Sequence, residues 1–228
     1  MKAIRYYGNK DLRFDEVPEP VPASGEMKLR VDFCGICATD VEEYLFGPKF
    51  ISVEPNPVSG QGLPVITGHE VTGTVVEVAP GITHVSTGDR VVIDGFLACN
   101  ACWSCSHGED NLCPNAATIG FGRNGGLAEY LTWPAANAVK LPDGVSSEHA
   151  GLVEPSSVAH HAVVRGNVGA GTRVVVLGAG VVGLLAMQAA RAAGAEVYAA
   201  DQRRMSLDMA TELGADGVLN TAEGDPAA

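Results

Sequence analysis

The features that this 228-residue sequence lacks exclude several classes of protein. No apolar run is long enough to cross a bilayer as a helix. The first residues, MKAIRYYGNKDLRF, contain no apolar h-region, so we expect no secretory signal and a cytoplasmic protein. No basic cluster offsets the net charge of -12, which would repel nucleic acid at long range. With 46% hydrophobic and 18% charged residues, we expect a globular protein that binds neither nucleic acid nor a membrane.

The first half of the sequence has the pattern of short β-strands. MKAIRYY, EMKLRVDF and the run from Val71 to Val78 are rich in β-forming residues, and clusters of Pro, Gly, Asn and Ser separate them. The pattern becomes helical from Ser147, and Ser146 or Ser147 is the expected N-cap. We therefore expect one domain over residues 1–150 and a second domain over residues 151–228.

The second half alternates strands and helices. The apolar run TRVVVL precedes an Ala-rich helix, VVGLLAMQAARAAG, which is followed by the strand EVYAAD, the helix RMSLDMATELG and the apolar segment ADGVLN. This alternation predicts a parallel sheet. The sequence ends after one half of a doubly wound sheet, and we expect a fragment of a longer chain rather than half an architecture.

Four of the six cysteines are closely spaced, as C-x-x-C-x-x-C-x7-C: Cys99, Cys102, Cys105 and Cys113. Four thiolates this close in sequence can surround one zinc ion tetrahedrally. The alternatives are disulfides, which a reducing compartment disfavours, and an iron–sulfur cluster, whose bacterial ferredoxin spacing ends in C-x3-C-P. A closed four-thiolate zinc site has no open position, so we expect it to stabilise the fold and not to catalyse.

A glycine motif, G-x-G-x-x-G, follows the apolar strand and opens the Ala-rich helix. Gly178 permits a tight turn, Gly180 lets the backbone approach a pyrophosphate, and Gly183 lets the helix pack closely on the strand. The helix then begins at Val181 and Val182, where free N–H groups can bind phosphate. A glycine-rich turn without a ligand is the ordinary alternative.

Asp201 ends the next strand, 18 residues after Gly183. Its carboxylate is placed to bind the ribose hydroxyls of an adenosine and to repel a 2′-phosphate, so NAD is favoured over NADP. Arg203, close by, weakens that preference.

Three further candidate ligands lie far apart in the sequence: Cys37, His69 and Glu154. Taken alone, His69 could be an ordinary loop or core histidine, and Glu154 could be an ordinary glutamate on a helix surface. Cys37 forms a C-x-x-C with Cys34, but the four other cysteines already complete a closed zinc site, and no thioredoxin-like context surrounds the pair. A catalytic zinc takes three protein ligands and an open position, so Cys37, His69 and Glu154 could together provide one, and we interpret Cys34 as a buried bystander.

Several motifs together resemble one family, the zinc-containing medium-chain alcohol dehydrogenases. The matching pieces, in the family's order and spacing, are Cys37-Ala-Thr39-Asp40, Gly68-His69-Glu70, the four-cysteine segment, Gly88-Asp89-Arg90-Val91 and the glycine motif. The resemblance implies a GroES-like β-barrel catalytic domain followed by a partial Rossmann parallel sheet. It also implies that a zinc on Cys37, His69 and Glu154 acts as a Lewis acid while NAD takes a hydride from the alcohol.

The resemblance also implies roles for three neighbours of the zinc ligands. Thr39 is the first member of a proton relay, Asp40 orients His69, and Glu70 either replaces a bound water or acts as an alternative ligand to Glu154.

The expected substrate class follows from the same resemblance. Glu154 in place of a cysteine ligand, and the segment EYLFGPKFISVEPNPVSGQGLPVITGHE, resemble the polyol and butanediol branch. This implies a vicinal diol or acyloin, such as 2,3-butanediol or acetoin, with sorbitol and threonine dehydrogenases as near alternatives. A non-catalytic, zinc-stabilised nucleotide-binding module would need only the four cysteines and the glycine motif. Relatives continue for a further third, so we expect a poorly active chain here and, at full length, a homo-oligomer with two zinc ions per subunit.

Overall fold

The computed structural model describes residues 1–223 and divides into two compact units, Met1–Glu154 and Pro155–Ala228. The division falls inside helix α4 (Val153–Arg165), four residues beyond the boundary that we expected after residue 150. No helix within residues 1–223 is long and apolar enough to span a membrane.

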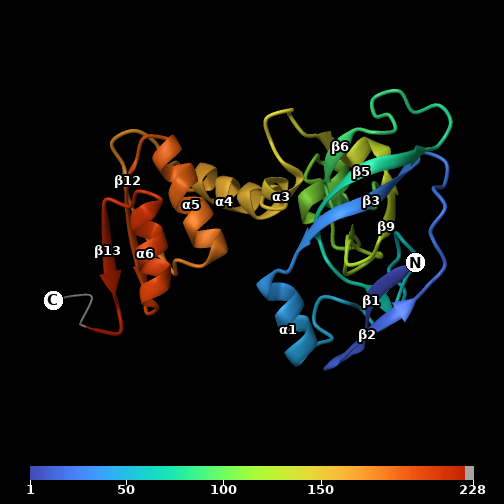
Figure 1. Ribbon diagram of the computed structural model, residues 1–228, viewed down its shortest axis with the longest axis horizontal. Helices are drawn as coiled ribbons and strands as arrows, with labels where there is room; N and C mark the ends of the chain where they lie inside the picture. The colour runs from blue at the N-terminus through green and yellow to red at the C-terminus, as the bar shows by residue number, and fades with distance from the viewer. Residues whose placement is uncertain (224–228) are drawn as a thin grey trace. The chain divides into compact units, whose positions relative to one another are not determined.

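The first unit is built from antiparallel β-sheets and short helices (Figure 1). One sheet has the order β10-β6-β5-β3-β9, a second has the order β2-β1-β4, and a third pairs β7 with β8. The strands are β1 (Lys2–Gly8), β2 (Asp11–Glu16), β3 (Glu26–Gly35), β4 (Val65–Ile66), β5 (Glu70–Val78), β6 (Arg90–Ile93), β7 (Phe96–Leu97), β8 (Ala117–Thr118), β9 (Tyr130–Pro134) and β10 (Ala138–Lys140). The helices are α1 (Ala38–Phe46), α2 (Trp103–Ser106), η1 (Asp110–Leu112), η2 (Ala135–Asn137) and α3 (Ser147–Ala150).

The strands expected at MKAIRYY, EMKLRVDF and 71–78 are confirmed as β1, β3 and β5. The expected helical segment after Ser146 is divided into α3 and α4. Ser146 is the N-cap of α3, because its hydroxyl accepts a hydrogen bond of 3.1 Å from the backbone N–H of His149.

A core of aliphatic side chains and one tryptophan lies between the strands of the first unit. Met27 and Leu29 on β3 pack with Val75 on β5 and Trp133 on β9, and all four are fully buried. The indole N–H of Trp133 donates to the carbonyl of Asp94 at 2.9 Å, so the core leaves this polar group satisfied. The core thus anchors β3 and β5, the two strands next to the candidate ligands Cys37, His69 and Glu70.

The predicted β-barrel is not closed. In the described residues, β10 and β9 form the two edges of the five-stranded sheet and do not pair with each other. Strands β4, β7 and β8 have only two residues each, so they form separate short ladders rather than the continuous ladder that closure requires. Register shifts in β3 between Lys28 and Leu29 and between Val31 and Phe33 add local bends.

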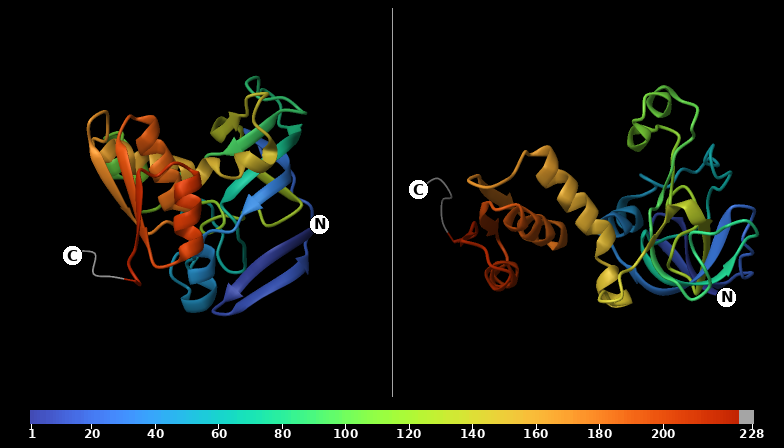
Figure 2. Two further views of the ribbon diagram at one scale, coloured as in Figure 1. Left: turned by 60° about the vertical axis from the view of Figure 1, so that its left-hand side comes forward. Right: turned by 90° about the horizontal axis from the view of Figure 1, so that it is seen from above.

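The second unit is a short parallel sheet with helices, as the alternating pattern predicts (Figure 2). Its strands β11 (Arg173–Leu177), β12 (Glu196–Asp201) and β13 (Gly217–Asn220) lie in that order. Helices α5 (Val181–Ala192) and α6 (Arg204–Glu212) connect them and pack on the strands. Met187 and Ala190 of α5 are fully buried in the core of this unit.

Candidate metal centres and dinucleotide site

Four cysteine sulfurs form one cluster of candidate metal ligands. The sulfurs of Cys99, Cys102, Cys105 and Cys113 all lie within 4.8 Å of one another. They belong to a lobe between β7 and β8, whose pairing closes its base; the lobe projects from the sheets in the right-hand view of Figure 2. Short helical turns place the ligands, since Cys102 is the N-cap of α2 and Cys113 follows η1.

The spacing of these sulfurs fits zinc. Cys105 Sγ lies 3.4 Å from Cys102 Sγ and 3.9 Å from Cys99 Sγ. A tetrahedral zinc with Zn–S bonds of 2.3 Å would have sulfur–sulfur edges of about 3.8 Å. All six cysteines carry free thiols, which does not support the disulfide alternative.

Two of the lobe cysteines have shifted pKa values. Backbone N–H groups, that of Ala101 first, lower the pKa of Cys99 to about 6. Loss of solvation, and then the neighbouring thiols, raise the pKa of Cys105 to about 12. A divalent cation bound here would favour the thiolate forms that coordination requires.

The second cluster joins residues that lie far apart in the sequence. The sulfur of Cys37 and ligand atoms of His69 and Glu70 all lie within 4.8 Å of one another. The pairing of β3 with β5 places Gly35 opposite Glu70, which brings Cys37, two residues beyond Gly35, beside His69. Gly35 is needed here, because a Cβ at this position would collide with the Glu70 carboxylate.

Gly68 sets the direction of the chain into His69. Its φ is +93°, and a Cβ would lie 2.6 Å from the sulfur of Cys34 and 2.8 Å from Cγ of Leu127. Cys34 packs against the core of the first unit, and burial raises the pKa of its thiol to about 12. Within residues 1–223, Cys34 belongs to neither ligand group.

Asp40 connects the two halves of the second cluster. Its Oδ2 accepts a hydrogen bond of 2.9 Å from the backbone N–H of Cys37, and its Oδ1 lies 3.5 Å from His69 Nδ1. On the other side of the ring, Thr39 Oγ1 lies 3.4 Å from His69 Nε2. The carboxylate thus hydrogen-bonds the backbone of one candidate ligand and lies beside the ring of another, although Asp40 Oδ1 and His69 Nδ1 are buried without a hydrogen-bond partner.

The charges in this cluster shift two pKa values. Burial favours neutral His69, but Asp40 and then Cys37 outweigh it and raise the pKa of His69 to about 9. Burial is also the main reason that the pKa of Glu70 is raised, although the charge of His69 opposes the shift. His69 and Glu70 are each 8% exposed, so water screens these interactions weakly. A thiolate, an imidazole and a carboxylate in one such place are a donor set that fits a catalytic zinc.

Among the described residues, Glu154 does not belong to the cluster of Cys37, His69 and Glu70, whose ligand atoms lie within 4.8 Å of one another. The carboxylate in that group is Glu70. Glu154 nevertheless interacts with the cluster, because burial, and then the charge of Glu70, raise its pKa while His69 lowers it. Two carboxylates therefore lie near the same thiol and imidazole.

One further residue at this cluster, Phe121, has no signal in the sequence. Its ring centroid lies 4.9 Å from that of His69, at an interplanar angle of 39°. Phe121 follows β8 in the chain, and only the fold brings it beside a histidine 52 positions earlier.

The glycine motif of the second unit lies between β11 and α5. Gly178 has a φ of +94°, and Gly180 is the N-cap of α5. A Cβ at Gly183 would collide with the carbonyl oxygen of Gly178, so glycine is required where the helix meets the turn. Val181 and Val182, which begin α5, are exposed. The free N–H groups of this helix end therefore face a surface that a phosphate can reach.

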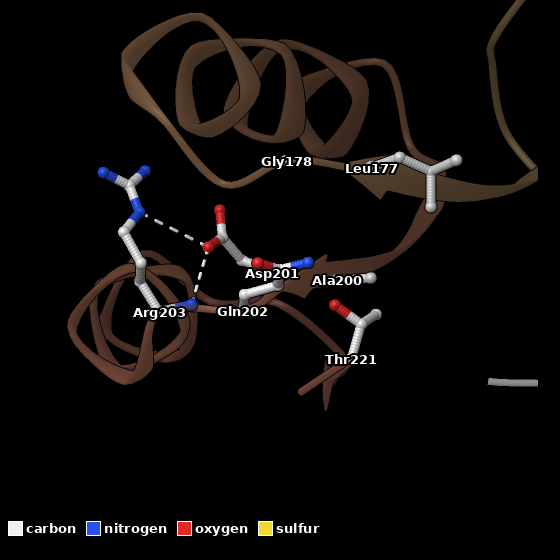
Figure 3. A pocket seen from close by; sticks show the side chains of 7 residues that line it. All are labelled: Leu177, Gly178, Ala200, Asp201, Gln202, Arg203 and Thr221. Atoms are coloured by element: carbon white, nitrogen blue, oxygen red, sulfur yellow. Dashed lines mark hydrogen bonds and ion pairs between the residues drawn. The ribbon is translucent and has the colours of Figure 1, made fainter. Parts of the chain in front are cut away.

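Asp201 lies beside the glycine motif at the end of β12 (Figure 3). Its carboxylate accepts hydrogen bonds of 2.8 Å from the backbone N–H groups of Ala179 and Arg203, and the Arg203 side chain lies 3.4 Å away. These groups lower the pKa of Asp201, and the backbone N–H of Arg203 makes the largest contribution. A cleft of about 390 Å³ opens here, lined by Leu177, Gly178, Ala200, Asp201, Gln202, Arg203 and Thr221.

An antiparallel domain with two clusters of zinc-ligand type, joined in one chain to a G-x-G-x-x-G turn, has the features of a zinc-type dehydrogenase. Residues 23–143 match the alcohol dehydrogenase GroES-like domain, and residues 181–228 match the zinc-binding dehydrogenase family. The chain belongs to the zinc-containing medium-chain alcohol dehydrogenases.

The chain is similar to (R,R)-butanediol dehydrogenase of Bacillus subtilis strain 168, with 40% identity over 94% of this chain and 62% of the relative. A crystal structure of 2R,3R-butanediol dehydrogenase from Bacillus subtilis has a TM-score of 0.91 at 38% identity, covering 98% of this chain and 64% of that one. An alcohol dehydrogenase from Escherichia coli CFT073, solved with NADH, has a TM-score of 0.88 at 30% identity. The match covers 100% of this chain and 64% of that one. The chain thus spans about 60% of the length of these relatives.

Proposed function

We propose that this chain carries the metal and adenosine sites of a zinc- and NAD-dependent oxidoreductase that transfers a hydride between a secondary alcohol and NAD. The observation that carries the proposal is the cluster of half-buried Cys37 with buried His69 and Glu70, which joins a thiol, an imidazole and a carboxylate within 4.8 Å. A structural site would not need these three residues, because the four-cysteine lobe already offers a complete ligand set.

The protein groups around the cluster have separate tasks in this proposal. Bound zinc would supply Lewis-acid chemistry at the alcohol or carbonyl oxygen. Asp40 Oδ1 lies 3.5 Å from His69 Nδ1, and in this proposal the carboxylate orients the ring for metal binding. The Thr39 hydroxyl lies on the Nε2 side and is positioned to receive the proton of a substrate hydroxyl.

We propose Cys37 and His69 as constant ligands, with Glu154 and Glu70 as alternative third ligands. Glu70 lies closer to the other two ligands in this structure, whereas Glu154 is the ligand that the resemblance implies. Exchange between two carboxylates would let one of them leave when substrate arrives. Separate Glu70→Gln and Glu154→Gln variants, compared by metal affinity, identify the dominant ligand.

NAD is the proposed cofactor. Gly178, Gly180 and Gly183 would bring the pyrophosphate to the start of α5, at Val181 and Val182. Asp201 would accept hydrogen bonds from the adenosine ribose, and Arg203 would lie beside it. The negative charge of Asp201 disfavours a 2′-phosphate, which supports NAD over NADP.

The proposed substrates are vicinal diols and acyloins, such as 2,3-butanediol and acetoin. The similarity to butanediol dehydrogenase supports this choice, with sorbitol, other polyols and threonine as the alternatives. A panel of butanediol stereoisomers, acetoin, sorbitol and threonine, each with NAD and NADP and assayed on a chain of its relatives' full length, tests the assignment. Threonine as the best substrate would contradict it.

Metal stoichiometry separates an enzyme from a non-catalytic, zinc-stabilised nucleotide-binding module. The enzyme requires two zinc ions per chain, whereas the module requires only the one in the four-cysteine lobe. We expect two zinc ions in the purified chain by elemental analysis, together with NADH binding by fluorescence. One zinc ion per chain would favour the module.

A further inference from the structure

Helix α1 carries a fully buried carboxylate that the proposed mechanism does not use. Glu43 is 1% exposed. Its two oxygens accept hydrogen bonds from the backbone N–H groups of Lys49 at 3.0 and 3.1 Å, Phe50 at 2.8 Å and Ile51 at 3.4 Å. The Lys49 ammonium instead pairs with the exposed Glu42, at 3.4 Å. The partners found for the Glu43 carboxylate are thus backbone amides of one loop.

The position of this carboxylate is unfavourable for a negative charge. It lies in the last turn of α1, where the helix dipole disfavours a negative charge, and burial disfavours it further. The group also has little room, because a Cβ at Gly47 would lie 2.7 Å from Glu43 Oε1 and 2.5 Å from the buried hydroxyl of Tyr6. Burial, and then the charge of Glu43, raise the pKa of Tyr6. The three amides compensate the charge only while the loop keeps this conformation.

The loop that Glu43 holds leads directly to the buried ligand cluster. The ring of Phe50 lies 5.7 Å from the ring of Phe121, in a T-shaped contact. The ring of Phe121 lies 4.9 Å from the ring of His69. Three aromatic rings thus run in sequence from the loop to one of the candidate zinc ligands.

We propose that Glu43 is a positioning residue, which fixes the Phe50 loop and thereby the aromatic wall against His69. This inference rests on the proposed function, because it assigns Glu43 a role in shaping the surroundings of the same metal centre. Phe50 is 52% exposed, so its ring is available both to Phe121 and to a small molecule approaching the cluster.

Cobalt provides a test that does not depend on turnover. In the Co²⁺-loaded chain, imidazole can bind only at a centre with an open position, so it should change the visible spectrum of the Cys37 centre and not that of the four-cysteine lobe. We expect Glu43→Gln to weaken imidazole binding about tenfold, the effect of losing hydrogen bonds to a charged group. Glu54→Gln is the matched control, because Glu54 is exposed in the same loop, and it should bind imidazole like the parent.

A double-mutant cycle separates positioning from a general loss of stability. Phe50→Ala removes an exposed ring and should fold normally, with the same weakening of imidazole binding as Glu43→Gln. The double variant should bind no more weakly than either single variant, because both changes act through the same wall. Thermal unfolding of each variant is measured alongside, since a variant that binds weakly only because it is unfolded also loses its cobalt spectrum.

The outcomes distinguish this inference from the proposed function. A parent chain without an imidazole-sensitive cobalt centre overturns the proposed function and the inference with it. A normal parent with an unchanged Glu43→Gln variant overturns the inference alone. Additive losses in the double variant also overturn it, because Glu43 and Phe50 would then act independently.

Discussion

The two candidate metal centres of this chain are assembled in opposite ways. The lobe takes four thiols from one stretch, Cys99 to Cys113, and lies away from the main sheets. The second centre takes Cys37 from the end of β3 and His69 and Glu70 from the start of β5. The first can form from local turns alone, whereas the second exists only when β3 and β5 pair in one register.

The difference also appears in the surroundings of the ligands. The lobe satisfies its thiols with backbone N–H groups and with each other. The second centre depends on Asp40, which contacts both the Cys37 backbone and the His69 ring. Loss of the metal from the lobe should therefore leave the rest of the first unit folded. The second centre, in contrast, should be lost whenever the packing around it is disturbed. Four predictions test this contrast.

The largest expected effect is loss of the lobe in Cys102→Ser. Structural zinc in zinc-finger peptides supplies about 10–16 kcal/mol of apparent binding free energy, so residues 98–116 should lose their fold. Limited proteolysis should show new cleavage in this stretch, with one zinc ion fewer per chain. Ser104→Ala is the control in the same helix. A lobe that resists protease without its metal would show that the metal is not needed for its fold.

The second expected effect is loss of the other metal ion in Cys37→Ser, with the lobe intact. Zinc should fall from two ions to one per chain, because the second centre loses its thiolate ligand. Cys34→Ser should keep both ions, since this buried thiol belongs to neither ligand group. Equal metal loss in both variants would mean that Cys34 and Cys37 act as a pair.

The third expected effect is on the pH dependence of metal binding. The pKa of His69 is raised from 6.5 to about 9, so a metal ion must displace a proton below pH 9. The contribution of the His69 proton should raise zinc affinity at this centre by about tenfold per pH unit up to pH 9, and the affinity should then level off. Without metal, the same shift stabilises the fold below pH 6.5, and this stabilisation is lost as the pH rises through 9.

Competitive zinc titrations between pH 6 and 10 measure this effect. Asp40→Asn should shift the levelling point to lower pH, because Asp40 makes the largest contribution that raises the His69 pKa. An affinity that does not change between pH 6 and 9 would show that His69 is already neutral in the free site.

The smallest expected effect concerns the dinucleotide site, whose residues lie close together in sequence like those of the lobe. Asp201→Asn should weaken NADH binding about tenfold and reduce the preference over NADPH, because a charged hydrogen-bond acceptor is lost. Fluorescence titrations with both nucleotides measure this. Asp208→Asn removes a charge from an exposed ion pair with Arg204 on α6 and should change neither affinity. Equal effects of the two variants would indicate long-range charge alone.

Local patterns predicted most elements, and non-local pairing explains the differences. β1, β3, β5 and the parallel strands of the second unit follow from β-forming runs and strand–helix alternation. The expected GroES-like domain is present without a closed barrel in the described residues, because closure depends on pairing between edge strands that no local pattern encodes. The helical stretch around residue 150 was predicted without its division at Gly151 and Leu152.

At the candidate sites, the lobe and the glycine motif could be located by spacing, since their residues are neighbours in the chain. The second centre could be suspected but not assembled. The sequence contains both Glu70 and Glu154, and only the register that places Gly35 opposite Glu70 brings that carboxylate next to Cys37. Phe121 and the amide contacts of Glu43 had no sequence signal, because an aromatic ring or a glutamate in a loop or helix is ordinary.

The sequence by itself determined the four-thiol lobe, the strand–turn–helix of the glycine motif and the order of strands and helices, because short-range spacing and backbone freedom control them. Tertiary structure alone decided which carboxylate meets Cys37 and His69, which ring packs on His69 and which loop Glu43 holds. These contacts join residues separated by tens of positions, and their geometry comes from sheet register and core packing.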